Sequence, residues 1–471
     1  MKYAILLAAL LARVAFPQIS ENEMRSELDD LYDRSLFRSA LAAVNVVDLK
    51  DGETLYRKND RLLMTPASNV KLYTTAAALL YLGEDYEFTT QVGYIGEIHD
   101  SVLYGDAYAV GGMDPDLTFE DVREFARGIA DLGVKEIRGD LYADVSAMDS
   151  LFWGEGWMWD DDPSSDSPYL TPLTVNDNAM WVRVFPNGED SAVGVEIIPA
   201  ASCVEIENRA LARMTPVEDL EITRDFVNRR NAVIIKGDMS LYEDEDWEIL
   251  NVYEPAMYFM TLMRDCLDTL GVSVSGGIDY ATTPPIARPI HTIRRPFADV
   301  IDNLNKESDN LSAELTLRAM GAFREGTPAT AEKGLAYVDS LIVASGRDPK
   351  DYRFADGSGL SRYNLTTADL TTQVLRAMYN GDRRTFETFK GSLPVAGEDG
   401  TLKRRMRGTS AEGRVFAKTG TMSGVSALSG YVETIGGRQL AFSIMVQRYV
   451  GSSRYAKRFE DDVCEILARL E

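Results

Sequence analysis

Histidine and cysteine are scarce in this chain of 471 residues, and their scarcity argues against several kinds of catalytic site. Only two histidines occur, His99 and His291, and neither lies in a catalytic motif. A Ser-His-Asp hydrolase needs one of them, and a metal centre built on imidazole needs several ligands of this kind. The three cysteines, Cys203, Cys266 and Cys464, are widely spaced and odd in number. We therefore expect no disulfide framework and no metal site.

Positive charge is also in short supply. The chain has 49 lysines and arginines against 74 aspartates and glutamates, which gives a formal net charge of −25. An acidic surface repels both nucleic acid and anionic membranes, so we expect no nucleic-acid partner. An anionic substrate would have to be attracted by a local group of basic side chains.

Long apolar runs are missing beyond the N-terminus. No internal stretch reaches the roughly 18 apolar residues that a membrane-spanning helix requires. Met1-Lys2 and the apolar run over residues 3–12 resemble a signal peptide, which we place at residues 1–20. We therefore expect an exported, periplasmic protein with no integral membrane segment in the mature chain.

Elements near both ends of the chain are predicted to form one sheet. Two strands, over residues 40–49 and 54–57, flank an Asp51-Gly52 turn signal. Two more strands are expected at 428–433 and 439–447, followed by a terminal helix with one apolar face. The sequence predicts an α+β fold, with an antiparallel sheet flanked by helices.

A β-rich insertion of one or two domains is predicted between the two ends. Short strands separated by turn residues dominate residues 87–285, so residues 21–86 and 286–471 would be the two parts of the main domain. Three tryptophans cluster in an acidic loop of this insertion, and we favour packing at a domain junction over a substrate platform for them. They are Trp153, Trp157 and Trp159.

The most informative pattern is a serine and a lysine at the start of a helix that should end at Gly83. Ser68 and Lys71 are one helical turn apart, which places a hydroxyl and an amine on the same face. A lysine can remove the proton of a serine nucleophile when burial or nearby positive charge lowers the pKa of the lysine. Taken alone, the pair is better explained by a helix cap and a solvent-facing lysine.

Two further motifs give this pair its weight. Ser308-Asp309-Asn310 precedes an apolar helix, and Lys418-Thr419-Gly420 ends an expected strand. Each has a plain structural explanation, as a helix cap or as a turn. The three motifs together, in this order, resemble the penicillin-recognising serine enzymes.

The long gap between Lys71 and Ser308 narrows this resemblance. With this gap, the chain resembles the class C low-molecular-mass penicillin-binding proteins. These are D-alanyl-D-alanine carboxypeptidases/endopeptidases of peptidase family S13, and they carry extra domains between the first and second motifs. Nearly the whole mature chain takes part in the resemblance, including three segments outside the main motifs. They are Gly111-Gly112-Met113-Asp114-Pro115, Asn176-Asp177-Asn178 and Asp356-Gly357-Ser358-Gly359.

The resemblance implies roles in catalysis for residues of the first two motifs. Ser68 would attack the carbonyl of the penultimate D-alanine and form an acyl-enzyme, with Lys71 as the general base. Lys418 would lie close enough to lower the pKa of Lys71 by like-charge repulsion. Ser308 would pass a proton to the departing amine, and Asn310 would hold Lys71 and bind the substrate amide.

The third motif would bind the substrate. Lys418 and Thr419 would hold the terminal carboxylate, and Gly420 would let the substrate backbone lie against the strand. The backbone N–H groups of Ser68 and Thr421 would form the oxyanion hole. The chemistry needs only side chains and backbone amides, so no cofactor is expected. Asp114 carries no functional assignment and is interpreted as a turn or surface residue.

The predicted function is a serine-type D-Ala-D-Ala carboxypeptidase that hydrolyses peptidoglycan stem peptides and is acylated by β-lactams. The sequence also leaves open whether the protein cleaves D-alanyl cross-links as a DD-endopeptidase. A β-lactamase on the same scaffold is an alternative, which the long insertion disfavours. A non-catalytic wall-binding or β-lactam-sensing module is another, disfavoured by the intact motifs and by the lack of a membrane helix.

Overall fold

The computed structural model describes residues 16–471. Residues 1–15, which make up most of the predicted signal peptide, lie outside the described residues. Ile19 already belongs to the fold, because its N–H donates to the Arg469 carbonyl at 3.0 Å and its carbonyl accepts from the Glu471 N–H at 3.1 Å. A mature chain that began at residue 21 would lack this pairing and the Ser20 cap of the first helix.

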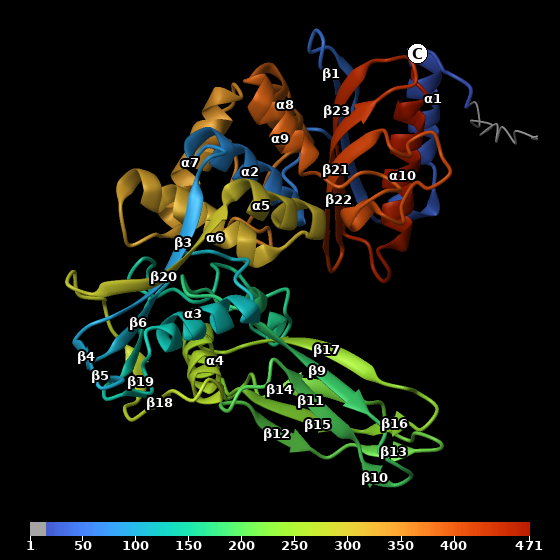
Figure 1. The fold of residues 1–471 in the computed structure, drawn as a ribbon. Helices are drawn as coiled ribbons and strands as arrows, with labels where there is room; N and C mark the ends of the chain where they lie inside the picture. The colour runs from blue at the N-terminus through green and yellow to red at the C-terminus, as the bar shows by residue number, and fades with distance from the viewer. Residues whose placement is uncertain (1–15) are drawn as a thin grey trace, which may run out of the picture.

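Both ends of the chain form one five-stranded antiparallel sheet with the order β2-β1-β23-β22-β21 (Figure 1). β1 and β23 pair along their whole length, from Leu41 opposite Gln447 to Asp48 opposite Leu440. The predicted α+β fold class is confirmed. The strands are β1 (Leu41–Asp48), β2 (Thr54–Lys58), β21 (Val415–Met422), β22 (Val425–Glu433) and β23 (Gln439–Gln447).

Helices cover both faces of this sheet. Side chains alternate between the faces, so Phe442 and Ile444 of β23 join one core while Met445 joins another. The first core lies under α1 and α10, which bring the two ends of the chain together (Figure 1). On the opposite face, buried Asn45 of β1 donates to the Thr372 hydroxyl of α8 at 2.6 Å. These helices are α1 (Glu21–Leu31), α8 (Ala368–Asn380) and α10 (Arg454–Ala468).

A second group of helices surrounds α2, which is buried over most of its length. A short 3-10 turn, Ala67–Asn69, precedes α2, so Ser68 lies in the turn and not in the helix itself. The helix ends as predicted: Gly83 has a φ of +87°, and its N–H donates to the Ala78 carbonyl at 3.2 Å. The group consists of α2 (Val70–Tyr81), α5 (Phe297–Asp302), α6 (Asn310–Glu325), α7 (Ala331–Ala344) and α9 (Arg383–Gly391).

The inner half of the insertion packs two helices against two sheets, and its core continues into the outer half. Its sheets have the orders β19-β8-β6-β3-β20 and β18-β7-β5-β4. β20 pairs antiparallel with β3 from Arg288 to Pro296, so this sheet includes residues beyond position 285, where the insertion was predicted to end. The helix α3 was not predicted.

The elements of this inner half are β3 (Glu87–Tyr94), β4 (Glu97–His99), β5 (Val102–Tyr104), β6 (Ala107–Val110), α3 (Phe119–Asp131), β7 (Glu136–Ile137), β8 (Leu141–Asp144), α4 (Pro255–Thr269), β18 (Ser273–Val274), β19 (Ile278–Tyr280) and β20 (Arg288–Pro296).

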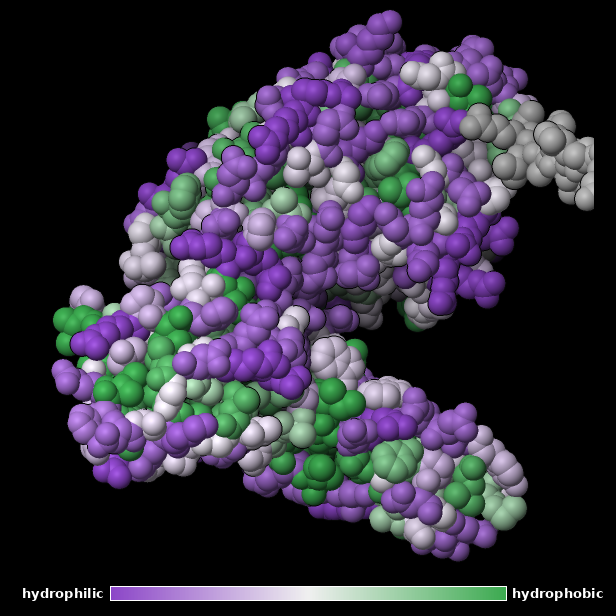
Figure 2. Space-filling model, viewed as in Figure 1, coloured by the Kyte–Doolittle hydropathy of each residue, from purple (hydrophilic) through white to green (hydrophobic). Residues whose placement is uncertain are grey.

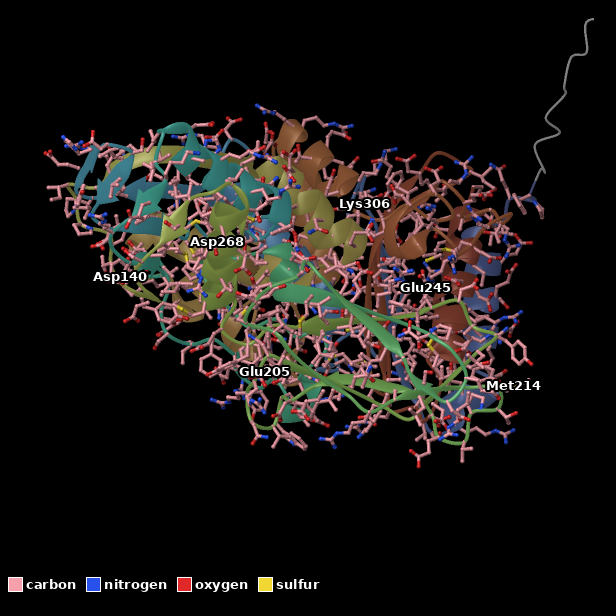
Figure 3. The ribbon with its side chains drawn as sticks, turned by 60° about the horizontal axis from the view of Figure 1, so that its bottom comes forward. Asp140, Glu205, Met214, Glu245, Asp268 and Lys306 are labelled. Atoms are coloured by element: carbon pink, nitrogen blue, oxygen red, sulfur yellow. The ribbon has the colours of Figure 1, made fainter. Side chains whose placement is uncertain are left out.

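The outer half of the insertion is an arm of three small sheets, with the orders β10-β13-β16, β11-β9-β17 and β12-β15-β14. The space-filling view shows an open hollow between this arm and the main domain (Figure 2). Figure 3 labels Glu205, Met214 and Glu245 along the arm. Its strands are β9 (Ala179–Phe185), β10 (Ser191–Ala192), β11 (Gly194–Ile198), β12 (Glu205–Asn208), β13 (Leu211–Arg213), β14 (Glu221–Arg224), β15 (Ala232–Lys236), β16 (Asp238–Ser240) and β17 (Asp246–Asn251).

Between residues 16 and 471, no helix combines the length and the apolar character needed to cross a membrane. Over the same range, no cluster of histidine, cysteine, aspartate and glutamate side chains is arranged to hold a metal ion. All three cysteines are free thiols: Cys203 is exposed, whereas Cys266 and Cys464 are buried.

Candidate active site

The three sequence motifs meet at one open cavity of about 410 Å³. The turn before α2, the segment before α6 and the edge strand β21 each supply part of its wall. The predicted site residues that line it are Ser68, Ser308, Asn310, Thr419 and Thr421. Lys71 and Lys418 lie beneath this surface, and neither has any exposed area.

The backbone around Ser68 is held in an unusual conformation. Ala67 has a φ of +49°, in the left-handed region that a residue with a Cβ rarely adopts. Two glycines allow other segments to approach this turn closely. A Cβ on Gly359 would lie 2.0 Å from the Ala67 carbonyl oxygen, and one on Gly420 would lie 2.8 Å from the Pro66 carbonyl oxygen.

The position of Gly420 requires a glycine for a different reason from the one expected. The missing side chain makes room for the Ser68 turn, whereas the substrate was expected to use that space. Along β21, Lys418 and Gly420 face this turn, and the alternate residues Thr419 and Thr421 line the cavity. The Asn69 side chain donates to the Lys418 carbonyl at 3.1 Å and fixes the strand against the turn.

Lys71 is placed to exchange a proton with Ser68. Its Nζ lies 3.2 Å from Ser68 Oγ, 2.5 Å from Asn310 Oδ1 and 2.8 Å from the Ser358 carbonyl oxygen. Burial lowers the pKa of Lys71 to about 8, and nearby carboxylates, of which Asp309 is the strongest, oppose that lowering. A pKa of about 8 leaves a usable fraction of neutral amine near neutral pH.

Lys418 forms the second buried amine of the site. Its Nζ donates to Ser308 Oγ at 2.7 Å and to the Thr419 carbonyl at 3.0 Å. Burial first, and Lys71 second, lower the pKa of Lys418 well below its usual value. Lys418 was expected to lower the pKa of Lys71, but burial is the cause of that lowering. The repulsion between the two amines instead adds to the effect of burial on the pKa of Lys418. Within residues 16–471, no carboxylate forms an ion pair with either amine.

The Ser308 segment depends on a local irregularity. A π-helical turn, Asn303–Glu307, ends at Ser308, which has a φ of +68°. Asp309 then caps α6 by accepting from the Ser312 N–H at 2.5 Å. The interpretation of this motif as a helix cap is therefore correct for Asp309. Figure 3 labels Lys306 of this turn, whose Nζ bonds to the Leu393 carbonyl at 2.8 Å.

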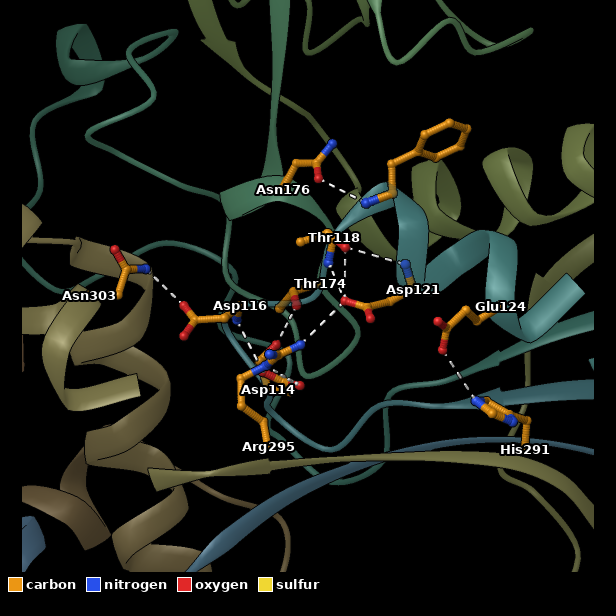
Figure 4. Close-up of polar contacts among 11 residues, drawn as sticks. Asp114, Asp116, Thr118, Asp121, Glu124, Thr174, Asn176, His291, Arg295 and Asn303 are labelled. Carbon is orange, nitrogen blue, oxygen red and sulfur yellow. Dashed lines mark hydrogen bonds and ion pairs between the residues drawn. The ribbon is translucent and has the colours of Figure 1, made fainter. Parts of the chain in front are cut away.

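The insertion supports this segment through two aspartates (Figure 4). Asp116 accepts from Asn303 Nδ2 at 2.8 Å and from Ser312 Oγ at 3.4 Å. Asp114 is fully buried and forms an ion pair with Arg295 at 2.9 Å. Asp114 is a turn residue, as the sequence indicated, because its Oδ1 accepts from the Asp116 N–H at 3.1 Å. It is not a surface residue, since its buried carboxylate anchors β20 to the loop that carries Asp116.

Other residues of the site gave no usable sequence signal. Asp166 of the insertion lines the cavity, and its backbone carbonyl accepts from Asn310 Nδ2 at 2.6 Å. Buried Glu314 of α6 accepts the N–H groups of Gly357 and Ser358, both at 2.9 Å, and so orients the carbonyl that binds Lys71. Only the spacing of Glu314 and Arg318, one turn apart on α6 and 2.6 Å from each other, could have hinted at this arrangement.

Comparisons with known proteins show which family this chain belongs to. The model of the D-Ala-D-Ala carboxypeptidase 3 (S13) family matches residues 24–470. The chain belongs to this family. A D-alanyl-D-alanine carboxypeptidase from Actinomadura sp. (strain R39) is 35% identical, over 92% of this chain and 82% of its own. The carboxypeptidase DacB of Haemophilus influenzae is 26% identical, over 83% of this chain and 82% of its own.

Solved structures show the same fold. The crystal structure of penicillin binding protein 4 (dacB) from H. influenzae matches with a TM-score of 0.84 at 24% identity, and covers 94% of this chain and 99% of its own. The predicted family and the penicillin-recognising fold are confirmed. This S13 enzyme is accordingly a serine D-Ala-D-Ala carboxypeptidase by family.

The pH dependence of acylation tests the state of Lys71. A neutral amine is required, so the rate of acylation by penicillin should rise about tenfold per pH unit up to about pH 8 and then level off. Asp309→Asn keeps a capping side chain but removes the carboxylate that most raises the pKa of Lys71. We expect its midpoint at lower pH than in wild type, measured by stopped-flow acylation. A midpoint that stays in place would contradict this origin of the pKa.

A second test concerns the support from the insertion. Asp116→Ala leaves the Asn303 amide without its acceptor, and a hydrogen bond to a charged group contributes about 1.5–3 kcal/mol. We expect penicillin acylation to slow by roughly tenfold to a hundredfold, because Ser308 and Asn310 are less well placed. Asp116→Asn retains an accepting oxygen and should keep most of the rate. Exposed Asp131→Ala on α3 is the control, and an equal rate in Asp116→Ala would exclude the supporting role.

Proposed function

We propose that this protein hydrolyses the D-Ala-D-Ala end of peptidoglycan stem peptides through an acyl-enzyme on Ser68, with Lys71 as the general base. The observation that carries the proposal is the 3.2 Å approach of Lys71 Nζ to Ser68 Oγ, beneath an open cavity lined by the other two motifs. Membership of the S13 family supplies the substrate class.

The acylation step uses both buried amines. Neutral Lys71 takes the Ser68 proton as Oγ bonds to the carbonyl carbon of the penultimate D-alanine. The N–H groups of Ser68 and Thr421 stabilise the oxyanion, aided by the N-terminal end of α2. When the C–N bond breaks, the leaving amine receives a proton through Ser308, whose Oγ lies 2.7 Å from Lys418 Nζ. D-alanine leaves, and water then hydrolyses the ester.

The cavity also suits an anionic peptide end. The terminal carboxylate binds near Lys418 and Thr419, whose hydroxyl donates to that of Thr401 at 2.9 Å. Arg405 and Lys457 also line the cavity, and Arg405 forms ion pairs with Glu460 and Asp461. Lys457 therefore supplies positive charge of the kind that a chain with a net charge of −25 needs to attract an anionic substrate.

The substrate backbone has a natural place along β21. This strand is at the edge of the five-stranded sheet, so an extended peptide can add to it as a further strand. β-Lactams, which mimic the D-Ala-D-Ala end, acylate Ser68 in the same position. Since the substrate is a component of the cell wall, the protein works outside the cytoplasm after export.

Substitution of the nucleophile is the direct test of this function. Ser68→Ala should lower the release of D-alanine from a stem pentapeptide by at least about a thousandfold, because the acyl-enzyme cannot form. Released D-alanine is measured with a coupled oxidase assay. Exposed Ser340→Ala on α7 is the control and should match wild type. Release by Ser68→Ala at the wild-type rate would refute the assignment.

A further inference from the structure

The tryptophan-rich loop of the insertion has two different parts. Trp157 is buried and donates its Nε1–H to Asp356 at 3.0 Å, and Trp153 packs against it with ring centroids 5.3 Å apart. These two tryptophans hold the insertion against the main domain, in line with the packing role favoured from sequence. Trp159 differs, because 73% of its surface is exposed.

Trp159 forms one side of an aromatic pocket of about 430 Å³. Its ring stacks on Phe226, with an interplanar angle of 26° and centroids 6.2 Å apart. Phe226 and Arg229 come from the turn between β14 and β15, and the Arg229 guanidinium lies over the ring of Phe152, 5.4 Å from its centroid. Two segments far apart in the sequence therefore build this pocket together.

A second pocket, of about 360 Å³, continues the first. The two share Phe152 and Tyr169, whose rings stack with an interplanar angle of 21°. Beyond this pair the wall is formed by Tyr253, Glu254 and Tyr280. We call the two pockets together the aromatic groove.

A buried ion pair fixes the groove relative to the catalytic cavity. Arg224, which is fully buried, bonds to Asp162 Oδ1 at 2.5 Å, and the Tyr169 hydroxyl bonds to Asp162 Oδ2 at 2.7 Å. Asp162 lines the groove, and Asp166, in the same loop, lines the catalytic cavity. A polymer bound in the groove can therefore present a side branch to Ser68.

We propose that the aromatic groove binds the glycan strand to which the stem peptide is attached. The apolar faces of N-acetylated pyranose rings lie flat on aromatic side chains such as Trp159, while Tyr, Arg and carboxylate groups bond to their hydroxyl and acetamido groups. The charges that line the groove largely cancel, because Asp162 is paired with Arg224 and the Arg229 guanidinium offsets Glu254, so the groove suits a neutral saccharide. This inference rests on the proposed function, which supplies the glycan-linked substrate.

Direct binding is tested with a soluble probe, the β-1,4-linked tetramer of N-acetylglucosamine. The chain has five tryptophans, whose indole N–H signals can be followed by NMR in the ¹⁵N-labelled full chain. We expect the signal that is absent from Trp159→Ala to shift on titration, while that of Trp247 on the arm stays in place. No shift of the Trp159 signal up to millimolar tetramer would overturn the proposal.

Turnover gives the second readout. With stem peptides on intact glycan strands, Trp159→Ala should release D-alanine roughly threefold to tenfold more slowly than wild type at limiting substrate. With the same peptide free of glycan, the two should be equal. Phe226→Ala, which removes the ring under Trp159, should behave likewise, and the matched control Trp247→Ala should match wild type on both substrates.

The outcomes separate this inference from the proposed function. Equal loss on free and glycan-linked peptide would mean that Trp159 contacts the peptide, and would overturn the glycan assignment. Unchanged turnover of both substrates in Trp159→Ala and Phe226→Ala would overturn it as well. Failure of the proposed function would instead appear as absence of D-alanine release from the free peptide by wild type.

Discussion

The burial of two lysine amines beside one serine is the constraint on which this active site depends. An ammonium removed from water is costly unless it finds partners or loses its proton. Lys71 and Lys418 are both fully buried, and their partners are a side-chain amide, hydroxyls and backbone carbonyls. These groups stabilise an amine without forcing it to stay charged. Lys71 can therefore serve as a base at a pH where an exposed lysine cannot.

The surrounding structure keeps carboxylates from forming an ion pair with Lys71. Glu314 and Asp356 lie close to Lys71 and raise its pKa, yet neither contacts it, because each is bonded to the backbone of residues 357–361. Their hydrogen bonds fix the Ser358 carbonyl that Lys71 uses. Asp116 and Asp166 reach the site from the insertion and hold the segment of Ser308 and Asn310. The insertion is thus part of the architecture of the site as well as a separate surface.

The motifs and the sheet could be predicted because each is a local pattern. Ser68 and Lys71 share one helical turn, and the strands near both ends show their periodicity in the sequence. Contacts such as Asp116 with Asn303, or Asn310 with the Asp166 carbonyl, join residues separated by most of the insertion, so no local pattern reports them. The conformation of Ser308 depends on a π-helical turn that hydrophobic spacing does not reveal.

One element that was not predicted, α3, has a recognisable pattern at its start. Thr118 and Asp121 form a capping box at the start of α3, and this pairing is visible in the sequence. The strand β20 was not predicted, because it contains charged and proline residues that are unusual for a strand. Its pairing with β3 spans the whole insertion and needs the fold to be known.

The identity of the acylated residue tests the account most directly. Intact masses of wild type and Ser68→Ala would be recorded at intervals after mixing with penicillin. We expect wild type to gain the mass of one penicillin and to keep it for minutes, while Ser68→Ala gains nothing. An adduct on both proteins, or on neither, would contradict the assignment of Ser68. An adduct that disappears within seconds while penicillin is consumed would instead indicate a β-lactamase.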